Sequence, residues 1–319
     1  EAKVMVSSQN WPRWGNERIQ QVMRTQRDAY ANLNNQVLNL ANQGVTINEI
    51  HNEYQVPESL QQQWSARQYH GSEFHNSRAV LNRYLGYWDG NPATLAPLSP
   101  GDSAPLYVEM MGGAQPILKR AQSLHDAGEY RLAMEILNKL VYAEPQNQAG
   151  KDLLADCFEQ LGYQYESASM RNVFLSAAQE LRNGAPEVGP PRGTNPFLAQ
   201  AMTTTQWWDA MATRVDSNLA DEINFVINFS SPDTGQQFVI EMSGGTLTNI
   251  EGYRAQDADA SIVLNRSDLE TVIRGEATLA GQLQAGVGSI KPGNQQVLTQ
   301  LASVLVEFDA GFEVMPGTR

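Results

Sequence analysis

A glycine- and proline-rich segment divides this chain of 319 residues into two unlike parts. Residues 184–197 contain three glycines and four prolines, which interrupt helices and strands. Before this segment, apolar side chains recur at the spacing of amphipathic helices, and after it they alternate as in strands. We therefore predict a mixed fold class, with an all-α domain over residues 16–183, a linker over 184–197 and an α+β domain over 198–319.

Helix start and stop signals outline the first part of the chain. Gly44 ends a long amphipathic pattern, and Thr46 with Glu49 has the spacing of a capping box. The predicted helices cover residues 16–43, a short helix capped by Thr46, a stretch from Pro57 toward Trp64, residues 75–88 and residues 112–183, with a proline-containing linker over 92–105.

The predicted helices over residues 112–183 contain a repeat. Residues 127–133 resemble residues 161–167, and Gly128 and Gly162 lie 34 residues apart, which is the period of tetratricopeptide-type (TPR-like) helix pairs. Two such repeats cannot bury a solenoid core alone, so they must pack on a neighbouring domain or on a second copy of the chain. The alternative is two ordinary helical hairpins.

The part after the linker has the pattern of a small α+β domain. A turn at residues 232–235 joins two alternating segments into a hairpin. Ser267 is expected to cap the helix over 268–274, and the final helix is expected over 294–309. Its inner face would consist of Val297, Leu298, Leu301, Val304, Leu305 and Phe308. These side chains either enclose a tunnel for a fatty chain or form a filled core.

Charge and composition narrow the classes of partner. The net charge of −13 disfavours binding to a phosphate backbone, so we expect no nucleic-acid partner. No apolar run approaches 18 residues, so no membrane span is predicted. The single cysteine, Cys157, is expected to be a packing residue. The low lysine content and the negative charge favour a periplasmic or secreted location.

The chain opens on residues 1–6, which have the pattern of a strand, followed by a predicted loop over 7–16. A chain that begins inside a strand and without methionine is expected to be a fragment, such as a processed half or a separately encoded subunit.

The four histidines offer few sites for chemistry. None of them has a metal-ligand spacing to another, and His51 and His125 are expected at the surface. His70 and His75 flank a short segment just before a predicted helix. Backbone N–H groups at a helix start can hold an anion, so this segment is a candidate anion cradle. The alternative is a helix cap with aromatic packing.

Four segments carry a resemblance to a known family. They are residues 10–19 (NWPRWGNERI), 69–76 (YHGSEFHN), 83–92 (RYLGYWDGNP) and 107–113 (YVEMMGG). They resemble the alkyl sulfatases of the SDS-hydrolase type, which have a metallo-β-lactamase fold, and the resemblance continues to the end of the chain. It implies a remnant of the metallo-β-lactamase domain over residues 1–15, a helical dimerisation domain over 16–183, and a domain similar to sterol carrier protein 2 (SCP2-like) over 198–319.

The resemblance also implies hydrolysis of alkyl sulfate esters at a site with two zinc ions. Most of the family's zinc ligands, in HxHxDH and two acidic residues, would lie before Glu1. Asn10 stands where the family has a zinc-binding histidine, and an amide oxygen is a poorer zinc ligand than imidazole. By position, His75 would donate to or protonate the sulfate, and Tyr87 and Asn76 would bind it.

Two functions follow from this resemblance. In the first, the chain is the C-terminal portion of an alkyl sulfatase, completed by a zinc-binding N-terminal half that is a separate chain. It would supply the sulfate-binding side of the site, a homodimer interface in the helical domain and a module for the alkyl or fatty chain, and it would be inactive alone. In the second, it is a non-catalytic dimeric binding or assembly protein derived from that family, with lipid as a candidate ligand.

Overall fold

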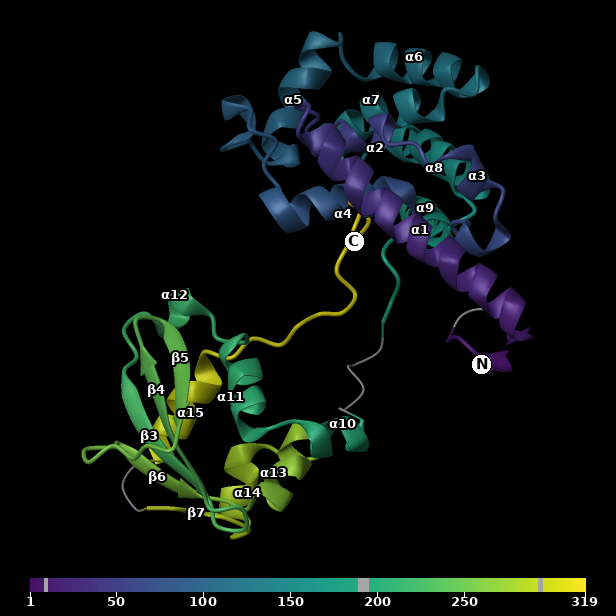
Figure 1. Ribbon diagram of the computed structural model, residues 1–319. Helices are drawn as coiled ribbons and strands as arrows, with labels where there is room; N and C mark the ends of the chain where they lie inside the picture. Colours follow the sequence, from purple (N-terminus) through teal and green to yellow (C-terminus); the bar gives the residue numbers. More distant parts are fainter. Residues whose placement is uncertain (9–10, 189–194, 292–294) are drawn as a thin grey trace. The chain divides into compact units, whose positions relative to one another are not determined.

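The computed structural model describes residues 1–8, 11–188, 195–291 and 295–319, which form two compact units (Figure 1). The first unit comprises residues 1–186 and 312–319 and is mainly helical, and the second, residues 187–311, contains a five-stranded sheet. This confirms the predicted order of a helical domain followed by a domain of helices and strands. None of the helices in the described ranges is both long and apolar enough to cross a bilayer.

The first unit opens on a two-stranded antiparallel ladder. β1 (Val4–Met5) pairs with β2 (Arg13–Trp14). The loop predicted over residues 7–16 is therefore wrong at β2, because pairing with a strand earlier in the chain outweighs the local Pro12 and Gly15 signals. The Arg13 guanidinium lies 4.0 Å from the centroid of the Trp64 ring and donates to the carbonyl of Trp11 at 2.7 Å. These contacts hold β2 against the segment that follows the first helix.

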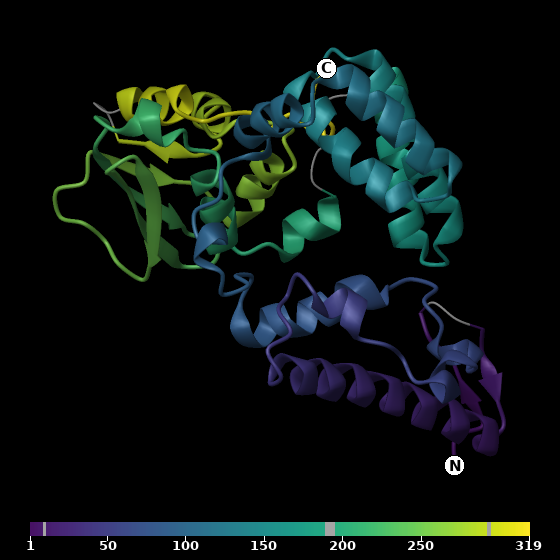
Figure 2. The same ribbon diagram turned by 90° about the horizontal axis from the view of Figure 1, so that it is seen from above.

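A long helix and a shorter one form the first layer of this unit. α1 (Asn16–Ala41) and α4 (Glu73–Leu85) lie side by side (Figure 2). Their packed faces share a core with the short elements between them, and its buried members are Val37, Ile47, Ile50, Tyr54 and Leu81. Those short elements are α2 (Ile50–Glu53), α3 (Glu58–Gln61) and the 3₁₀ helix η1 (Trp64–Ala66).

Five longer helices complete the first unit. They are α5 (Pro100–Met110), α6 (Ala114–Asp126), α7 (Tyr130–Ala143), α8 (Gln148–Gln164) and α9 (Ala168–Asn183), preceded by the 3₁₀ helix η2 (Pro92–Thr94). The linker predicted over 92–105 is wrong from Pro100 onward. The Ser99 hydroxyl caps α5 by accepting from the Asp102 amide at 3.2 Å, and a proline in the first turn loses no helical hydrogen bond.

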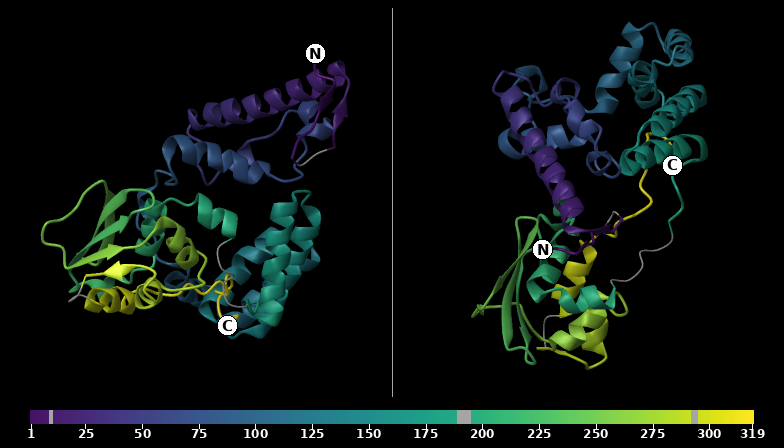
Figure 3. Two further views of the ribbon diagram at one scale, coloured as in Figure 1. Left: turned by 90° about the horizontal axis from the view of Figure 1, so that it is seen from below. Right: turned by 45° about the vertical axis from the view of Figure 1, so that its right-hand side comes forward.

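The second unit is a sheet with its helices gathered on one face (Figures 1 and 3). The strand order is β5-β4-β3-β6-β7, in which β3 and β6 are parallel and the other neighbours are antiparallel. Phe229 and Ile227 of β3 and Ile240 of β4 point into the core, where Trp208 packs edge-on against Phe229 with centroids 5.6 Å apart. The strands are β3 (Phe225–Ser231), β4 (Gln236–Ser243), β5 (Thr246–Glu251), β6 (Ala260–Val263) and β7 (Ser289–Ile290). The helices are α10 (Pro196–Ala201), α11 (Thr204–Ala212), α12 (Ser217–Ala220), α13 (Arg266–Ile273), α14 (Leu279–Gln284) and α15 (Gln295–Ser303).

Two predicted features of the second unit are wrong. α15 ends at Ser303 instead of 309, because the backbone beyond it pairs with residues 214–216, and Phe308 is 60% exposed rather than part of the inner face. The cap of α13 is also not Ser267. The Asp233 carboxylate accepts from the amides of Arg266 at 2.7 Å and of Ser267 at 3.1 Å.

The last eight residues pack with the first unit, whereas the sequence division placed them with the second domain. One buried carboxylate oxygen of Glu180, in α9, accepts from the amides of Val314 at 2.7 Å and Met315 at 2.8 Å and from the Thr318 hydroxyl at 2.8 Å. Gly317 has a positive φ of 69° and lies against Pro145, where a side chain would collide with the backbone. The terminal segment is thus held by the helical unit.

Candidate functional site

The first turn of α4 carries two of the residues expected to bind sulfate. Ser72 precedes the helix in an extended conformation, and its side chain makes no capping hydrogen bond to the backbone. Its buried hydroxyl oxygen lies instead 3.1 Å from Nδ1 of His75. His75 and Asn76 are both exposed, so their free donor groups are accessible to a ligand.

The faces of α4 separate these residues. Asn76 shares its face with Glu73 and Arg83, and this face lines a pocket against α1, whereas His75 is not among the lining residues. Tyr87 follows the helix and is 87% exposed. Within the described part of the chain, no hydrogen bond or ring contact joins His75 to Tyr87. His75, Asn76 and Tyr87 therefore lie on or just after one helix, but His75 and Tyr87 make no direct contact with each other.

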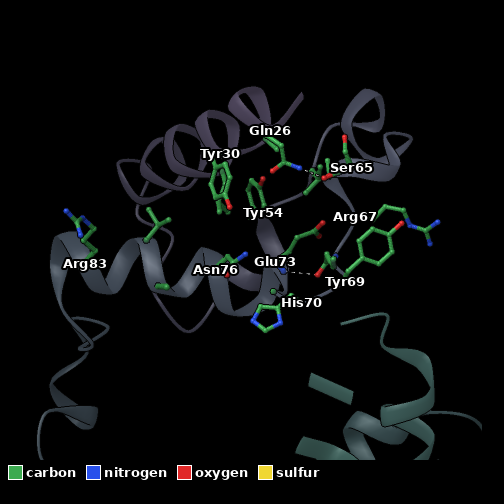
Figure 4. A pocket seen from close by; sticks show the side chains of 18 residues that line it. Gln26, Tyr30, Tyr54, Ser65, Arg67, Tyr69, His70, Glu73, Asn76 and Arg83 are labelled. Carbon is green, nitrogen blue, oxygen red and sulfur yellow. Dashed lines mark hydrogen bonds between the residues drawn. The ribbon is translucent and has the colours of Figure 1, made fainter. Parts of the chain in front are cut away.

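The pocket has a volume of about 900 Å³ and lies between α1, α4 and the loop before α4 (Figure 4). Its polar lining includes Gln26 and Tyr30 from α1, Tyr54, and Glu73. The Gln26 side chain donates to the Ser65 carbonyl, which fixes one end of the wall. The remaining walls are partly apolar and include Leu33, Val56, Ala66, Ala79 and Val80. The pocket can hold a ligand with both polar and apolar parts.

Two acidic groups of the pocket have shifted pKa values. Burial raises the pKa of the Glu73 carboxyl above its ordinary value, and a hydrogen bond from Gln68 only partly opposes this. Burial, with a smaller contribution from Glu73, raises the pKa of Tyr54 to about 12. The Tyr54 hydroxyl donates to the side chain of Asn32 at 3.1 Å. Near Tyr54 and Glu73, the pocket therefore favours a neutral or hydrogen-bonding part of a ligand over a negatively charged part.

The loop before α4 is anchored by the start of α9. The Ser167 hydroxyl donates to the carbonyl of His70 at 2.8 Å, and the Ala168 amide donates to the carbonyl of Tyr69 at 3.1 Å. Arg67 forms an ion pair with Glu166 at 2.7 Å. The carbonyls of Tyr69 and His70, at the start of the proposed anion cradle, are thus held by residues at the beginning of α9. The anion cradle between His70 and His75 stays a prediction.

Sequence reasoning missed several residues of this region and misplaced one. Tyr30, Tyr54 and Glu73 gave no signal, because the pocket they line forms only when α1 and α4 pack together. His51 was expected to be solvated, but its Nδ1 is buried without a hydrogen-bond partner. Asn10 lies outside the described residues.

Metal ligands do not converge in the described ranges of the chain. No group of three or more histidine, cysteine, aspartate or glutamate side chains in these ranges has the arrangement of a metal site. Cys157 is buried among helix side chains, which raises the pKa of its thiol to about 11. These residues do not by themselves fit a zinc site, and we assign them no step that involves zinc.

Comparison with known proteins finds alkyl sulfatases along nearly the whole chain, in agreement with the resemblance in its motifs. The family model of the alkyl sulfatase dimerisation domain matches residues 46–184, and that of the alkyl sulfatase C-terminal domain matches residues 192–317. A linear primary-alkylsulfatase from Pseudomonas sp. is 38% identical over 99% of this chain and 47% of its own length. An alkyl/aryl-sulfatase from Saccharomyces cerevisiae is 36% identical over 98% of this chain and 48% of its own length.

A solved structure agrees with these sequence matches. A stereoselective inverting sec-alkylsulfatase from Pseudomonas sp. superposes with a TM-score of 0.90 at 35% identity, over 98% of this chain and 49% of that protein. The chain thus spans about half the length of the relatives it matches. It belongs to the alkyl sulfatase family and contains that family's dimerisation and C-terminal domains.

Proposed function

We propose that this chain is the C-terminal portion of a zinc-dependent alkyl sulfatase that hydrolyses alkyl sulfate esters to an alcohol and sulfate. The observation that carries the proposal is the match to alkyl sulfatases over 98–99% of the chain, in sequence and in fold. Since the chain spans about half of those proteins, it would contribute one part of a complete enzyme.

In this proposal, the sulfate group is bound by donors on and after α4. As the ester bond breaks, negative charge grows on the bridging oxygen, and an acid placed there lowers the barrier. His75 would protonate or hydrogen-bond this oxygen, while Asn76 and Tyr87 would donate to the other sulfate oxygens. The exposure of all three side chains supports this role, because a group supplied from elsewhere can reach them. Ser72 would orient the His75 ring through its contact with Nδ1.

The zinc ions of the proposed enzyme would be held mainly by residues outside this chain. When bound, they would supply the activated water that attacks the ester. The part that holds them would be the part of the relatives that this chain does not span, on the same or a separate polypeptide. The chain alone would then bind and orient substrate without turning it over.

We also propose that the helical unit forms a homodimer. Large apolar side chains are exposed on and near α5, among them Leu106 at 59% and Met110 at 77%. Leu106 and Met110 are four residues apart on α5 and so share one face, and exposed apolar side chains gathered on one face are typical of a surface that another protein covers. We further interpret the helix pairs α6–α7 and α8–α9 as TPR-like repeats, which need such a neighbour.

The second unit is proposed to be an SCP2-like module that binds the apolar chain of the substrate. Leu301 and Leu305 of the closing segment pack against the sheet, where they would border that chain. Displacement of a fluorescent fatty acid from the full chain tests this role. Displacement by dodecyl sulfate at micromolar concentration supports it, and no binding of the probe favours a filled core.

The second candidate function is a non-catalytic dimeric binding or assembly protein. Asn10 favours it, because an asparagine replaces the histidine expected at a zinc-binding position. The experiment that separates the two functions is release of sulfate from dodecyl sulfate, with and without the missing part. The first function predicts turnover only when that part is added, and it predicts bound zinc in the complete protein. No turnover and no zinc in the complete protein would favour the second.

A further inference from the structure

Two nitrogen-bearing side chains, His51 and Arg131, lie against the ring of Phe74, outside the pocket between α1 and α4, and a third, Arg78, acts by its charge on His51. The His51 ring, from α2, has its centroid 5.3 Å from that of Phe74. The Arg131 guanidinium, from α7, lies 5.3 Å from the same ring centroid. Arg78 follows Phe74 by one helical turn on α4 and therefore shares its face. Residues from α2, α4 and α7, far apart in the sequence, thus meet at one aromatic ring.

The charges in this cluster are not compensated by the protein. Neither Arg78 nor Arg131 forms an ion pair with a carboxylate in the described part of the chain, although acidic residues outnumber basic ones by 35 to 22. The charged groups that act on His51 are these two arginines, and together with burial they lower its pKa. Nδ1 of His51 is buried and has no hydrogen-bond partner. A buried nitrogen without a partner is costly, and a ligand would relieve that cost.

We propose that His51, Arg78 and Arg131 form a binding site for a small tetrahedral oxyanion of the sulfate or phosphate type. Both arginines are exposed, so the anion can enter from solvent. Guanidinium groups present paired N–H donors that match two oxygens of such an anion. The imidazole supplies a further donor once it is protonated, and the bound anion would favour that protonated form. The overall charge of −13 repels long polyanions, so the ligand is small.

This site uses none of the residues proposed to bind the ester, and the present proposal holds whether or not the chain takes part in hydrolysis. Two kinds of ligand carry such an oxyanion: free inorganic sulfate and the head group of a sulfate monoester. Methyl sulfate serves as the probe for the monoester head group.

The test is NMR of the full chain with labelled histidine, in which H51Q identifies the His51 signal. Sodium sulfate is added at millimolar concentration against sodium chloride of equal ionic strength. We expect sulfate, but not chloride, to shift the His51 signal and to raise its pKa. R78Q and R131Q should each weaken sulfate binding by roughly fivefold to tenfold. Methyl sulfate should bind more weakly than inorganic sulfate if the site prefers the free dianion. It should bind as tightly as inorganic sulfate if the site accepts the head group of a monoester.

R120Q is the matched control, because it removes the same charge from an exposed position on the neighbouring helix α6. It should leave the sulfate affinity within twofold of the parent. Circular dichroism checks that each variant is folded. Equal responses to sulfate and chloride, or equal losses in R120Q and R78Q, would overturn the proposal, since the effect would then reflect general screening. Because the readout is binding at His51, the result does not depend on whether the complete enzyme hydrolyses sulfate esters.

Discussion

The Ser72 hydroxyl lies 3.1 Å from Nδ1 of His75, across the first turn of α4. A hydroxyl that donates to Nδ1 leaves the ring proton on Nε2, the nitrogen that can then reach a ligand. Ser72 makes no capping bond to the backbone, so its polar contact in this structure is with the histidine. The proposed sulfate site requires this arrangement, in which Ser72 is the donor and Nε2 of His75 carries the ring proton.

Replacing Ser72 by alanine should therefore change His75 without unfolding α4. We expect S72A to mix the two neutral tautomers of His75 and to lower turnover by about tenfold in the complete enzyme, because less of the ring can donate from Nε2. Nitrogen NMR of the His75 ring reports the tautomer directly. S77A is the control, since the Ser77 hydroxyl donates to the Glu73 carbonyl within α4. An unchanged tautomer in S72A would contradict the assignment.

The raised pKa of Glu73 predicts a pH dependence of stability. A carboxyl whose pKa is higher in the folded than in the unfolded state destabilises the fold as pH rises from the unfolded value through the folded one. E73Q should therefore melt at a higher temperature than the parent at pH 7 and at the same temperature below about pH 4. Melting curves from pH 3 to 8 measure this, with E135Q, at an exposed position of α7, as control. A lower melting temperature for E73Q than for the parent at pH 7 would contradict the prediction that the charged Glu73 carboxylate destabilises the fold.

Glu180 is expected to hold the C-terminal segment through one carboxylate oxygen. E180A leaves the amides of Val314 and Met315 and the Thr318 hydroxyl without this acceptor, and it should cost roughly 2–4 kcal/mol in the free energy of unfolding of the first unit. Urea titration measures the loss, and limited proteolysis should cut the terminal segment faster. Q179A, at the exposed neighbouring position, should stay within about 0.5 kcal/mol of the parent. A similarly small loss in E180A would show that the segment does not depend on this carboxylate.

The exposed face of α5 predicts a charge-sensitive dimer. L106E with M110E places two carboxylates one turn apart on the proposed apolar interface, and each must lose water to enter it. The dissociation constant of the dimer should rise at least about a hundredfold, so light scattering at micromolar concentration should give the mass of one chain. Q115E adds one carboxylate at an exposed position on α6 and should leave the dimer intact. A dimer that survives the double change would place the interface elsewhere.

Local patterns in the sequence predicted the parts of the fold that local forces decide. The amphipathic spacing and the glycine stop placed the first helix within two residues of α1. The alternation of residues 222–229, the turn at 232–235 and the apolar pattern of residues 237–242 predicted the β3–β4 hairpin, because turn residues and alternating side chains are both local signals. The Thr46 amide and hydroxyl donate to the Glu49 carboxylate at 3.0 and 2.7 Å, which is one half of the predicted capping box. Thr46 is not the cap of the helix, because the regular helix begins only at Ile50 and the Glu49 amide bonds to the Thr46 carbonyl.

Features that depend on distant parts of the chain were not predictable in this way. Residues 304–306 leave the helical path because backbone groups at 214–216 are available to pair with them. The final eight residues find their acceptor at Glu180, more than 130 positions earlier. The cluster around Phe74 joins three helices, and its arginines carry no spacing that marks a site. The motifs placed His75, Asn76 and Tyr87 in one stretch but could not assign the faces of α4.

Release of inorganic sulfate from dodecyl sulfate tests the central claim most directly. The chain is assayed alone, together with the part of an alkyl sulfatase that it does not span, and together with that part as the H75Q variant. We predict no turnover by the chain alone, turnover in the complete assembly, and a loss of at least about a hundredfold in H75Q. Turnover by the chain alone, or full activity of the H75Q assembly, would contradict the proposed division of the active site.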